Sequence, residues 1–477
     1  MELIIIFGPI IFSFLVYYIF RSNPDSAKYT ALGWFIILFI VAFNWLQQLP
    51  PDGGYLELGK YLPVPQFGFE LTLKVDALSI AMLLLTALLL ILVVFTSWEE
   101  KDQHIYIPLL VLFSGPIFGV FMTTNILWFF IFWELTLVPM LFLVGYWGAE
   151  ERIYAAVKFF LYTHVFAMFM FVAFFMIFAQ TGIWDFQQLA GKENLFKTPF
   201  LIWWLMFIGF AAKLPVVPFH TWLPDAHVQA PSSISVLLAG VLLKMGAYGL
   251  IRFTVQLMPE TTRHFAVYML AIGIITTLFA GFLAIYERHI KKMVAYSSIS
   301  HMGMVVVAIS TVTYDGLSAS LYEMIGHALV ISPLFLIAGW LHHKTHTWYM
   351  DEMGGIMKRA PFVSAIFILA GMAALGLPGT MGFVGELTIT VSAVKAYGWW
   401  VAVVAIAGLI SAGYIIWAVR RAIHGPESQL VAKTQFTISI PEQLALAMYG
   451  LLILYFGINP QPIFNLANQA FAIFGGN

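Results

Sequence analysis

The chain has 477 residues, of which 61% are hydrophobic and 10% charged, so it is far more apolar than a soluble globular domain. Its 23 Lys and Arg residues nearly balance its 24 Asp and Glu residues, which excludes the basic excess on which nucleic-acid binding relies. The lack of cysteine excludes disulfides, thiolate metal sites, iron–sulfur ligands and cysteine nucleophiles within this chain. The composition therefore indicates an integral membrane protein.

The first apolar run begins at Leu3 without a basic residue before it, and the first positive charge is Arg21, after the run. A secretory signal has the opposite arrangement. We therefore expect this segment to be retained as a membrane span.

Apolar stretches long enough to cross a bilayer follow one another along the chain. A helix needs roughly 20 residues to cross a hydrocarbon core of about 30 Å. Because continuous apolar runs dominate rather than alternating strands, we expect an all-α membrane protein with about fourteen transmembrane helices. The expected spans are 3–20, 30–48, 77–98, 106–124, 125–147, 155–180, 199–219, 232–254, 265–285, 293–311, 319–341, 361–394, 399–420 and 441–463.

Lys and Arg are distributed unevenly between the loops on the two sides of the membrane. The odd-numbered loops hold fourteen of them, and the even-numbered loops hold seven. Those seven are Lys60, Lys74, Lys192, Lys197, Arg252, Arg263 and Lys395. Because positively charged loops resist translocation, we expect the odd-numbered loops in the cytoplasm and both termini on the non-cytoplasmic side.

Two expected spans are interrupted by proline and glycine. The span at 199–219 contains Pro215 and Pro218, and the span at 361–394 contains Pro378 between glycines. Proline removes a helical hydrogen bond, and broken helices at membrane depth are tolerated where they line a buried or hydrated cavity. Since the breaks lie five spans apart, the sequence suggests two inverted five-helix repeats. The expected organisation is an N-terminal three-helix segment at 1–105, repeats at 106–258 and 259–425, and a C-terminal helix at 426–477.

Four charged side chains stand out inside expected spans, namely Glu134, Lys213, Lys244 and Glu386. An ionisable residue at the centre of a membrane helix costs about 2.5–3.5 kcal/mol on insertion scales, so each is a functional candidate. An alternative is that Glu134 and Lys213 form an inert structural pair while the other two reach the interface. We favour a proton path, because an inert structural pair requires neither charges on four spans nor broken helices. In this hypothesis, pairing with Glu134 keeps Lys213 protonated, and separation favours release toward Lys244.

Histidines add groups that titrate near neutral pH. His301 and His327 lie within expected spans, and Glu323 shares a helix face with His327 because the two are four residues apart. We expect His301 to relay protons. For His327 a relay and a buried structural role both stay open.

Three further histidines lie in or beside the sixth and seventh expected spans. His220 and His227 flank the end of the broken seventh span, where they either admit and relay protons or cap a helix. We favour proton uptake for His227. For His164, in the sixth span, we favour an ordinary hydrogen-bonded role.

A cluster of His342, His343 and His346 in an expected loop raises the question of a metal or haem. We expect solvated histidines there and no metal site, because no carboxylate or fourth ligand recurs at metal-site spacing. Glycine-rich nucleotide motifs are also missing from the sequence. The chain is therefore expected to have no cofactor and no redox or hydrolytic chemistry of its own.

Several long motifs resemble the M-type antiporter-like proton-pumping subunit of respiratory complex I, and the resemblance runs nearly end to end. They are Phe132-Trp-Glu134-Leu-Thr-Leu-Val-Pro139, Ala211-Ala-Lys213-Leu-Pro continuing to Pro231, Leu243-Lys244-Met-Gly, Ala295-Tyr-Ser-Ser-Ile-Ser-His301-Met-Gly and Leu377-Pro-Gly-Thr-Met-Gly-Phe-Val-Gly-Glu386.

The resemblance implies a fourteen-helix subunit that couples quinone reduction elsewhere in a complex to proton translocation. It implies other membrane subunits as partners, including sister antiporter-like subunits, a quinone bound elsewhere, and an energy-conserving inner or plasma membrane as the location. The electron donor, NADH or another carrier, would act on different subunits.

The resemblance also implies roles by position. Glu134 and Lys213 match the pair on the fifth and seventh helices, Lys244 the central lysine, His301 a histidine of the central axis, and Glu386 the exit-side group. Sister subunits and multi-subunit antiporters usually carry lysine at the last position, so Glu386 favours the M type. Glu323 and Pro333 depart from the family pattern.

Two other functions are compatible with parts of this pattern. The first is a subunit of a multi-subunit sodium/proton antiporter or membrane-bound hydrogenase built from the same module. The second is a haem-bearing membrane oxidase.

Overall fold

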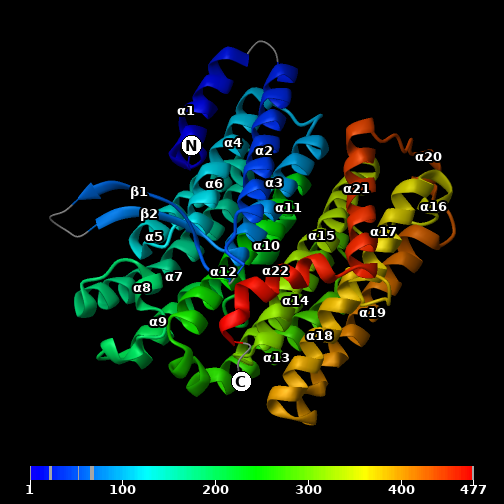
Figure 1. The fold of residues 1–477 in the computed structure, drawn as a ribbon. Coiled ribbons are helices and arrows are strands. Elements are labelled where there is room, and N and C mark those ends of the chain that lie inside the picture. Colours follow the sequence, from blue (N-terminus) through cyan, green and yellow to red (C-terminus); the bar gives the residue numbers. More distant parts are fainter. Residues whose placement is uncertain (1, 21–23, 52, 65–68, 475–477) are drawn as a thin grey trace. The chain divides into compact units, whose positions relative to one another are not determined.

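The computed structural model describes residues 2–20, 24–51, 53–64 and 69–474 (Figure 1). Arg21 and the chain ends at Met1 and 475–477 lie outside these residues. The chain divides into two compact units. Unit 1 comprises Met1–Leu214, Lys244–Ala266 and Leu466–Asn477, and unit 2 comprises Pro215–Leu243 and Val267–Asn465.

Unit 1 is built mainly from the helices before the first broken span. Its elements are α1 (Glu2–Phe20), α2 (Pro24–Gln47), α3 (Ala77–Thr96), α4 (Gln103–Met122), α5 (Ile126–Leu135), α6 (Leu137–Trp147), α7 (Arg152–Thr181), α8 (Phe186–Leu189), η2 (Glu193–Leu195), α9 (Pro199–Lys213) and the π-helix η4 (Leu250–Gln256). α1 packs along α4, α2 along α3, and α7 along α9. α12 (Leu243–Gly249) begins at the division between the units, and α13 (Pro259–Tyr286) continues across it, because its residues to Ala266 belong to unit 1 and those from Val267 to unit 2.

Unit 1 also contains a β-hairpin that the sequence analysis did not predict. β1 (Leu56–Val64) pairs antiparallel with β2 (Phe69–Val75), with Leu56 opposite Val75 (Figure 1). The signal is present in β2, where apolar and polar residues alternate and the side chains of Leu71, Leu73 and Val75 are fully buried. The strand leads directly into Asp76, which caps α3 by accepting a hydrogen bond from the backbone of Ser79.

Unit 2 is organised around one long buried helix, α15 (Tyr314–Thr345), which packs against α14, α17, α18 and α21 (Figure 1). The other elements are α10 (Trp222–Gln229), α11 (Ser232–Leu237), the π-helix η3 (Leu238–Leu242), α14 (Ile290–Ser310), α16 (Ile356–Arg359), α17 (Pro361–Ala374), α18 (Met381–Tyr397), η5 (Trp399–Ala405), α19 (Ile406–Ala418), the π-helix η6 (Val419–His424), α20 (Gln429–Lys433) and α21 (Ile440–Ile458). The last described elements are α22 (Gln461–Phe471), which passes from unit 2 to unit 1 at Leu466, and η7 (Ala472–Phe474), which belongs to unit 1.

Twelve helical stretches among the described residues are long and apolar enough to cross a membrane. Each corresponds to one of the expected spans, with ends that differ by several residues. The expected spans at 199–219 and 361–394 are not among the twelve, because each is divided. α9 ends at Lys213 and α17 ends at Ala374, and both are shorter apolar helices. A mostly helical membrane protein is thus confirmed.

Two assignments of residues to loops were wrong. Arg252 lies in η4, inside the stretch Ser232–Gln256, and is fully buried, so it leaves six basic residues in the even-numbered loops rather than seven. α15 continues to Thr345, so His342 and His343 lie in its last turn rather than in a loop. In both cases the helix continues past the end of the expected span, to Gln256 and to Thr345.

Candidate functional site

Glu134 lies at an interrupted point of its span in unit 1. α5 ends at Leu135 and α6 begins at Leu137, because Pro139 has no backbone N–H with which to continue the helical ladder. Oε2 of Glu134 lies 2.5 Å from Nδ1 of His164 on α7. Oε1 is buried without a hydrogen-bond partner among the described residues. The carboxylate is therefore held on one side only.

His164 has the hydrogen bond expected of it, but its partner is itself a candidate residue. The two residues are 30 positions apart on different helices, so no sequence spacing signals the contact. The side chain of His164 is 41% exposed. The structure thus adds His164 to the candidate site.

Lys213 is the last residue of α9, directly before the proline break. Its Nζ is buried, donates no hydrogen bond within the described chain, and lies 5.5 Å from the ring centroids of Trp133 and Phe159. Cation–π contacts of this kind contribute about 0.5–2 kcal/mol, and the negative end of the helix dipole also favours a cation at this position. Glu134 is close enough to attract the ammonium electrostatically, although the hydrogen bond of its carboxylate is with Nδ1 of His164.

Lys244 is fully buried in α12, between the π-helical segments η3 and η4. π-helical turns are rare and occur often at functional sites. Two residues along, a Cβ at Gly246 would lie 2.7 Å from the backbone nitrogen of Leu214, which follows Lys213. The glycine therefore allows the end of α9 to approach the helix that carries Lys244.

In unit 2, three of the predicted residues come together. Nδ1 of His301 on α14 lies 3.0 Å from Oε1 of Glu323 on α15, and both side chains are buried. The ring of His327, one turn along α15, lies 5.6 Å from the ring of His301 between centroids. The structure thus places His301, Glu323 and His327 in one buried polar cluster.

Glu386 on α18 belongs to the same neighbourhood, because its carboxyl group lies close enough to His301 and Glu323 to interact with them electrostatically. Its Oε1 is buried without a partner in the part of the chain that the structure describes. A Cβ at Gly376, whose φ is +78°, would lie 2.7 Å from Oε2 of Glu386, and a Cβ at Gly385 would collide with Oε2 of Glu323. These two glycines therefore allow α18 and its preceding turn to pack closely around two carboxylates.

The two histidines beside the first break lie against aromatic rings in unit 2. His220 is half-buried with its ring 5.7 Å from that of Phe279. His227 is fully buried in α10 and stacks on Phe335 of α15 at 4.6 Å. His227 is therefore an interior residue of its unit rather than a helix cap.

No group of three or more histidine, aspartate or glutamate side chains suited to a metal ion occurs within the described ranges. Of the three histidines at the end of α15, His343 and His346 are exposed, and His342 is half-buried and stacked on Trp348 at 3.8 Å between centroids.

Comparison with solved structures identifies the fold. The chain superimposes on a chain of the Mrp complex from Dietzia sp. DQ12-45-1b with a TM-score of 0.91 and 18% identity, covering 100% of this chain and 97% of the other. It superimposes on a chain of respiratory complex I from Thermus thermophilus with a TM-score of 0.86 and 24% identity, covering 100% of both chains. At these identities the likeness shows the fold alone.

Comparison with known sequences is more specific. Residues 123–411 match the family described as NADH:quinone oxidoreductase/Mrp antiporter, TM. The chain is 34% identical to NADH-quinone oxidoreductase subunit M of Rickettsia prowazekii over 97% of this chain and 96% of that protein. It is 37% identical to the protein of the same name from Pseudomonas aeruginosa over 96% of this chain and 94% of that protein. This chain therefore belongs to the antiporter-like subunit M family of NADH-quinone oxidoreductases.

Proposed function

We propose that this chain is the proton-translocating membrane subunit of a complex I-like quinone oxidoreductase. In this proposal, protons move along a buried axis of Glu134, Lys213, Lys244, His301 and Glu386, driven by redox chemistry in other subunits. The observation that carries the proposal is that charged side chains lie buried or half-buried beside interrupted membrane helices, where Nζ of Lys213 and Oε1 of Glu386 have no hydrogen-bond partner among the described residues.

The geometry in unit 1 suits a step in which a proton is released. Moving one proton against about 150 mV costs roughly 3.5 kcal/mol. Breaking a buried ion pair costs about 3–5 kcal/mol, because it leaves an uncompensated charge in a medium of low polarity. In this proposal Glu134 and Lys213 form an ion pair in one step and separate in the next, and a change of this size drives one proton off the lysine. His164 supports this step, because it offers Glu134 an alternative partner at 2.5 Å.

The geometry in unit 2 suits a relay. A neutral imidazole both donates and accepts hydrogen bonds, and His301 lies in hydrogen-bonding contact with Glu323 and beside His327. The carboxyl groups of Glu323 and Glu386 supply two further proton-carrying groups beside this imidazole. His220 and His227 serve as further candidates for proton uptake or relay.

The wider arrangement belongs to the same proposal. The twelve candidate spans and the two divided ones would give fourteen crossings, with inverted repeats at 106–258 and 259–425 flanked by 1–105 and 426–477. Both termini would lie on the non-cytoplasmic side of an energy-conserving membrane. The 41% exposure of the His164 side chain supports a neighbouring membrane subunit at that face, because an ionisable group facing lipid is costly. Quinone would bind elsewhere in the complex, and the chain would carry no cofactor of its own.

A subunit of a multi-subunit sodium/proton antiporter is the second candidate, because the fold is similar to that of a chain of the Mrp complex. Against it stand Glu386, where the resemblance implies lysine for antiporters, and the curated relatives named subunit M at 34–37% identity. Co-purification separates the two. Subunits with flavin and iron–sulfur clusters are expected with this chain, and their absence from an intact preparation would favour the antiporter.

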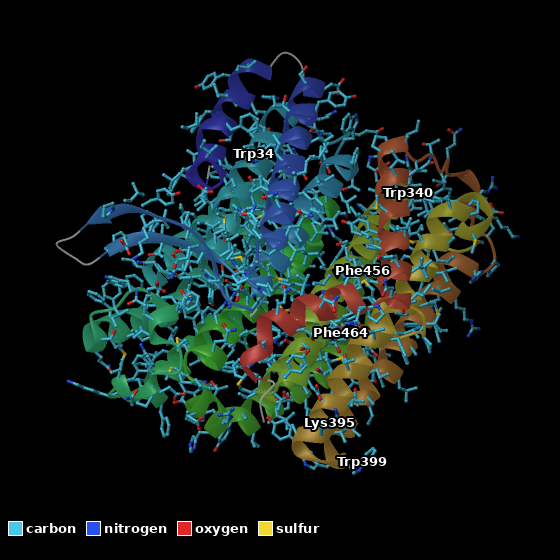
Figure 2. The ribbon with its side chains drawn as sticks, in the orientation of Figure 1. Trp34, Trp340, Lys395, Trp399, Phe456 and Phe464 are labelled. Carbon is cyan, nitrogen blue, oxygen red and sulfur yellow. The ribbon has the colours of Figure 1, made fainter. Side chains whose placement is uncertain are left out.

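The central test is proton pumping by the assembled complex after reconstitution into vesicles. Lys213→Ala and Glu386→Gln are expected to lower the rate of proton pumping by at least about tenfold, the effect of roughly 1.4 kcal/mol on a rate. Lys395→Ala is a matched control, because Lys395 is an exposed lysine at the end of α18 that pairs with Asp315 (Figure 2). Unchanged pumping in Lys213→Ala would refute the proposed path.

A further inference from the structure

A buried arginine–carboxylate pair lies in unit 1, on the same helical stretch as Lys244 but outside the proposed path. Arg252 is fully buried, and the side chain of Asp76 is 4% exposed. One guanidinium nitrogen of Arg252 donates to Oδ2 of Asp76 at 2.7 Å, and the other contacts Oδ1. The pair is bidentate, which is the strongest geometry for these two groups.

Three hydroxyl groups and one amide group continue the hydrogen-bond network on both sides of this pair. Arg252 donates to Oγ of Ser79 at 3.1 Å, and that hydroxyl lies 3.0 Å from the hydroxyl of Tyr248, which is also buried. On the other side, Arg252 donates to the hydroxyl of Tyr55 at 3.1 Å and to Oε1 of Gln256 at 2.8 Å, and both of these residues are half-buried. The network therefore runs from a fully buried tyrosine to side chains that reach the surface of the unit.

The buried end of the network points toward Lys244 along the helix. Lys244, Tyr248, Arg252 and Gln256 follow one another at intervals of four residues. Side chains at this spacing are neighbours on one side of a helix, and Arg252 lies roughly 10–12 Å from Lys244 along the axis at about 1.5 Å per residue or slightly less. A polar line thus leads from a buried lysine to the end of its span at Gln256.

In a subunit that translocates protons, such a line is a potential leak, because hydroxyl groups carry protons as readily outward as inward. We propose that Arg252, fixed by Asp76, is a barrier that prevents protons from passing between Lys244 and the Gln256 end of the span. This inference rests on the proposed function. Arginine stays charged at all accessible pH values, and a fixed guanidinium in a narrow polar passage repels protons and other cations.

A purely structural clasp is the competing explanation, since Asp76 also caps α3 and the pair joins that helix to η4. The two explanations differ in their dependence on the sign of the charge. A clasp fails equally when either partner is removed. A barrier fails when the cation is removed, and it is preserved or strengthened when the carboxylate is neutralised, because the positive charge then stands uncompensated.

The test measures passive proton influx into vesicles that contain the assembled complex, with an imposed membrane potential, an internal pH dye and no electron donor. Arg252→Gln is expected to raise influx by at least about tenfold, since removing a unit charge within a few ångströms of the passage changes its electrostatic barrier by more than 1 kcal/mol even at an effective dielectric of 20. Arg252→Lys and Asp76→Asn are expected to stay close to the unmodified complex. Thr86→Val is the control for a buried hydroxyl in α3 that bonds only within its own helix.

Vesicles that stay tight with Arg252→Gln, or that leak equally with Asp76→Asn, would overturn the barrier. Adding Tyr248→Phe to Arg252→Gln should lower the influx again. This substitution removes the hydroxyl group between Lys244 and position 252 and leaves the rest of the side chain in place. If Arg252→Gln does not assemble, the uncharged pair Asp76→Asn with Arg252→Gln replaces it. This pair leaks if the barrier is electrostatic, and its tightness would contradict the inference.

The result is separable from the proposed function. Lys244→Ala tests that function through pumping during turnover, whereas influx is measured at rest. Normal pumping in Lys244→Ala would remove Lys244 from the path, while the difference between Arg252→Gln and Asp76→Asn would still decide whether the arginine charge blocks protons.

Discussion

Lys213 and Glu386 both stand at broken helices, but different kinds of neighbour hold them. Lys213 is the last residue of α9, where the helix dipole favours a cation, and two aromatic rings face its ammonium group. Glu386 is the sixth residue of α18, beyond the first turn in which the dipole acts, and its neighbours are two glycines and the side chains of His301 and Glu323.

This difference shows that the place of the residue along its short helix constrains the sign of the charge at Lys213, at the end of α9, more strongly than at Glu386, inside α18. At Lys213, backbone and rings both select a positive charge. At Glu386, the selection rests on a cluster of titratable side chains, which can be satisfied by more than one combination of residues. This agrees with the implication of the family resemblance that sister subunits carry lysine at the second position.

The strongest test of this comparison is to reverse the charge at Lys213. Lys213→Glu places an anion at a helix C-terminus, facing aromatic rings and close to Glu134. A buried charge left without a partner costs about 3–5 kcal/mol, so pumping by the reconstituted complex should fall by about a hundredfold or more. Lys213→Arg keeps the sign and should retain more activity than Lys213→Glu. Equal activity of the two would show that the sign at the helix end is irrelevant.

A second experiment isolates the role of glycine beside Glu386. Gly376 and Gly379 both have positive φ, +78° and +89°, but only a Cβ at Gly376 meets Oε2 of Glu386, while the site at Gly379 is open. Either alanine substitution should destabilise the turn by about 1–2 kcal/mol through backbone strain, measured as a lower unfolding temperature. Only Gly376→Ala should also lower pumping, several-fold, because it displaces the carboxylate. Equal pumping by both variants would contradict a role for that contact.

The smallest effect concerns a helix N-terminus, where the dipole should disfavour a cation. His289 precedes α14 and accepts a hydrogen bond from the backbone of Lys292. Burial, with Lys291 nearby, lowers its pKa to about 4, below the ordinary value of 6.5. Because the unfolded chain then binds an additional proton between these values, the stability contribution of His289 is full above pH 6.5 and is lost as the pH falls toward 4.

His289→Asn retains a capping side chain without this titration. The unfolding temperature of the variant should therefore fall by a few degrees less than that of the unmodified protein between pH 7.5 and pH 4.5. An identical decrease in both proteins would assign the pH dependence to other groups.

Sequence alone located most of the spans, both breaks and every buried charge of the proposed path. Those features are local. A run of apolar residues specifies a membrane helix, and a proline removes one hydrogen bond within a turn. A charged residue in an apolar run is recognised in the sequence whichever residue it pairs with. The hairpin of β1 and β2 also left a local signal in the alternation of Phe69–Val75, which a search for long apolar runs does not detect.

Only the tertiary structure decided which polar groups meet. The contact of Glu134 with His164 joins residues 30 positions apart, that of His301 with Glu323 joins residues 22 apart, and that of Arg252 with Asp76 joins residues 176 apart. Arg252 was counted with the loop charges although it lies near the end of the span expected at 232–254, and the distant carboxylate that allows it to be buried leaves no mark beside it in the sequence. Side-chain pairing across helices depends on how the helices pack, and no local pattern encodes that packing.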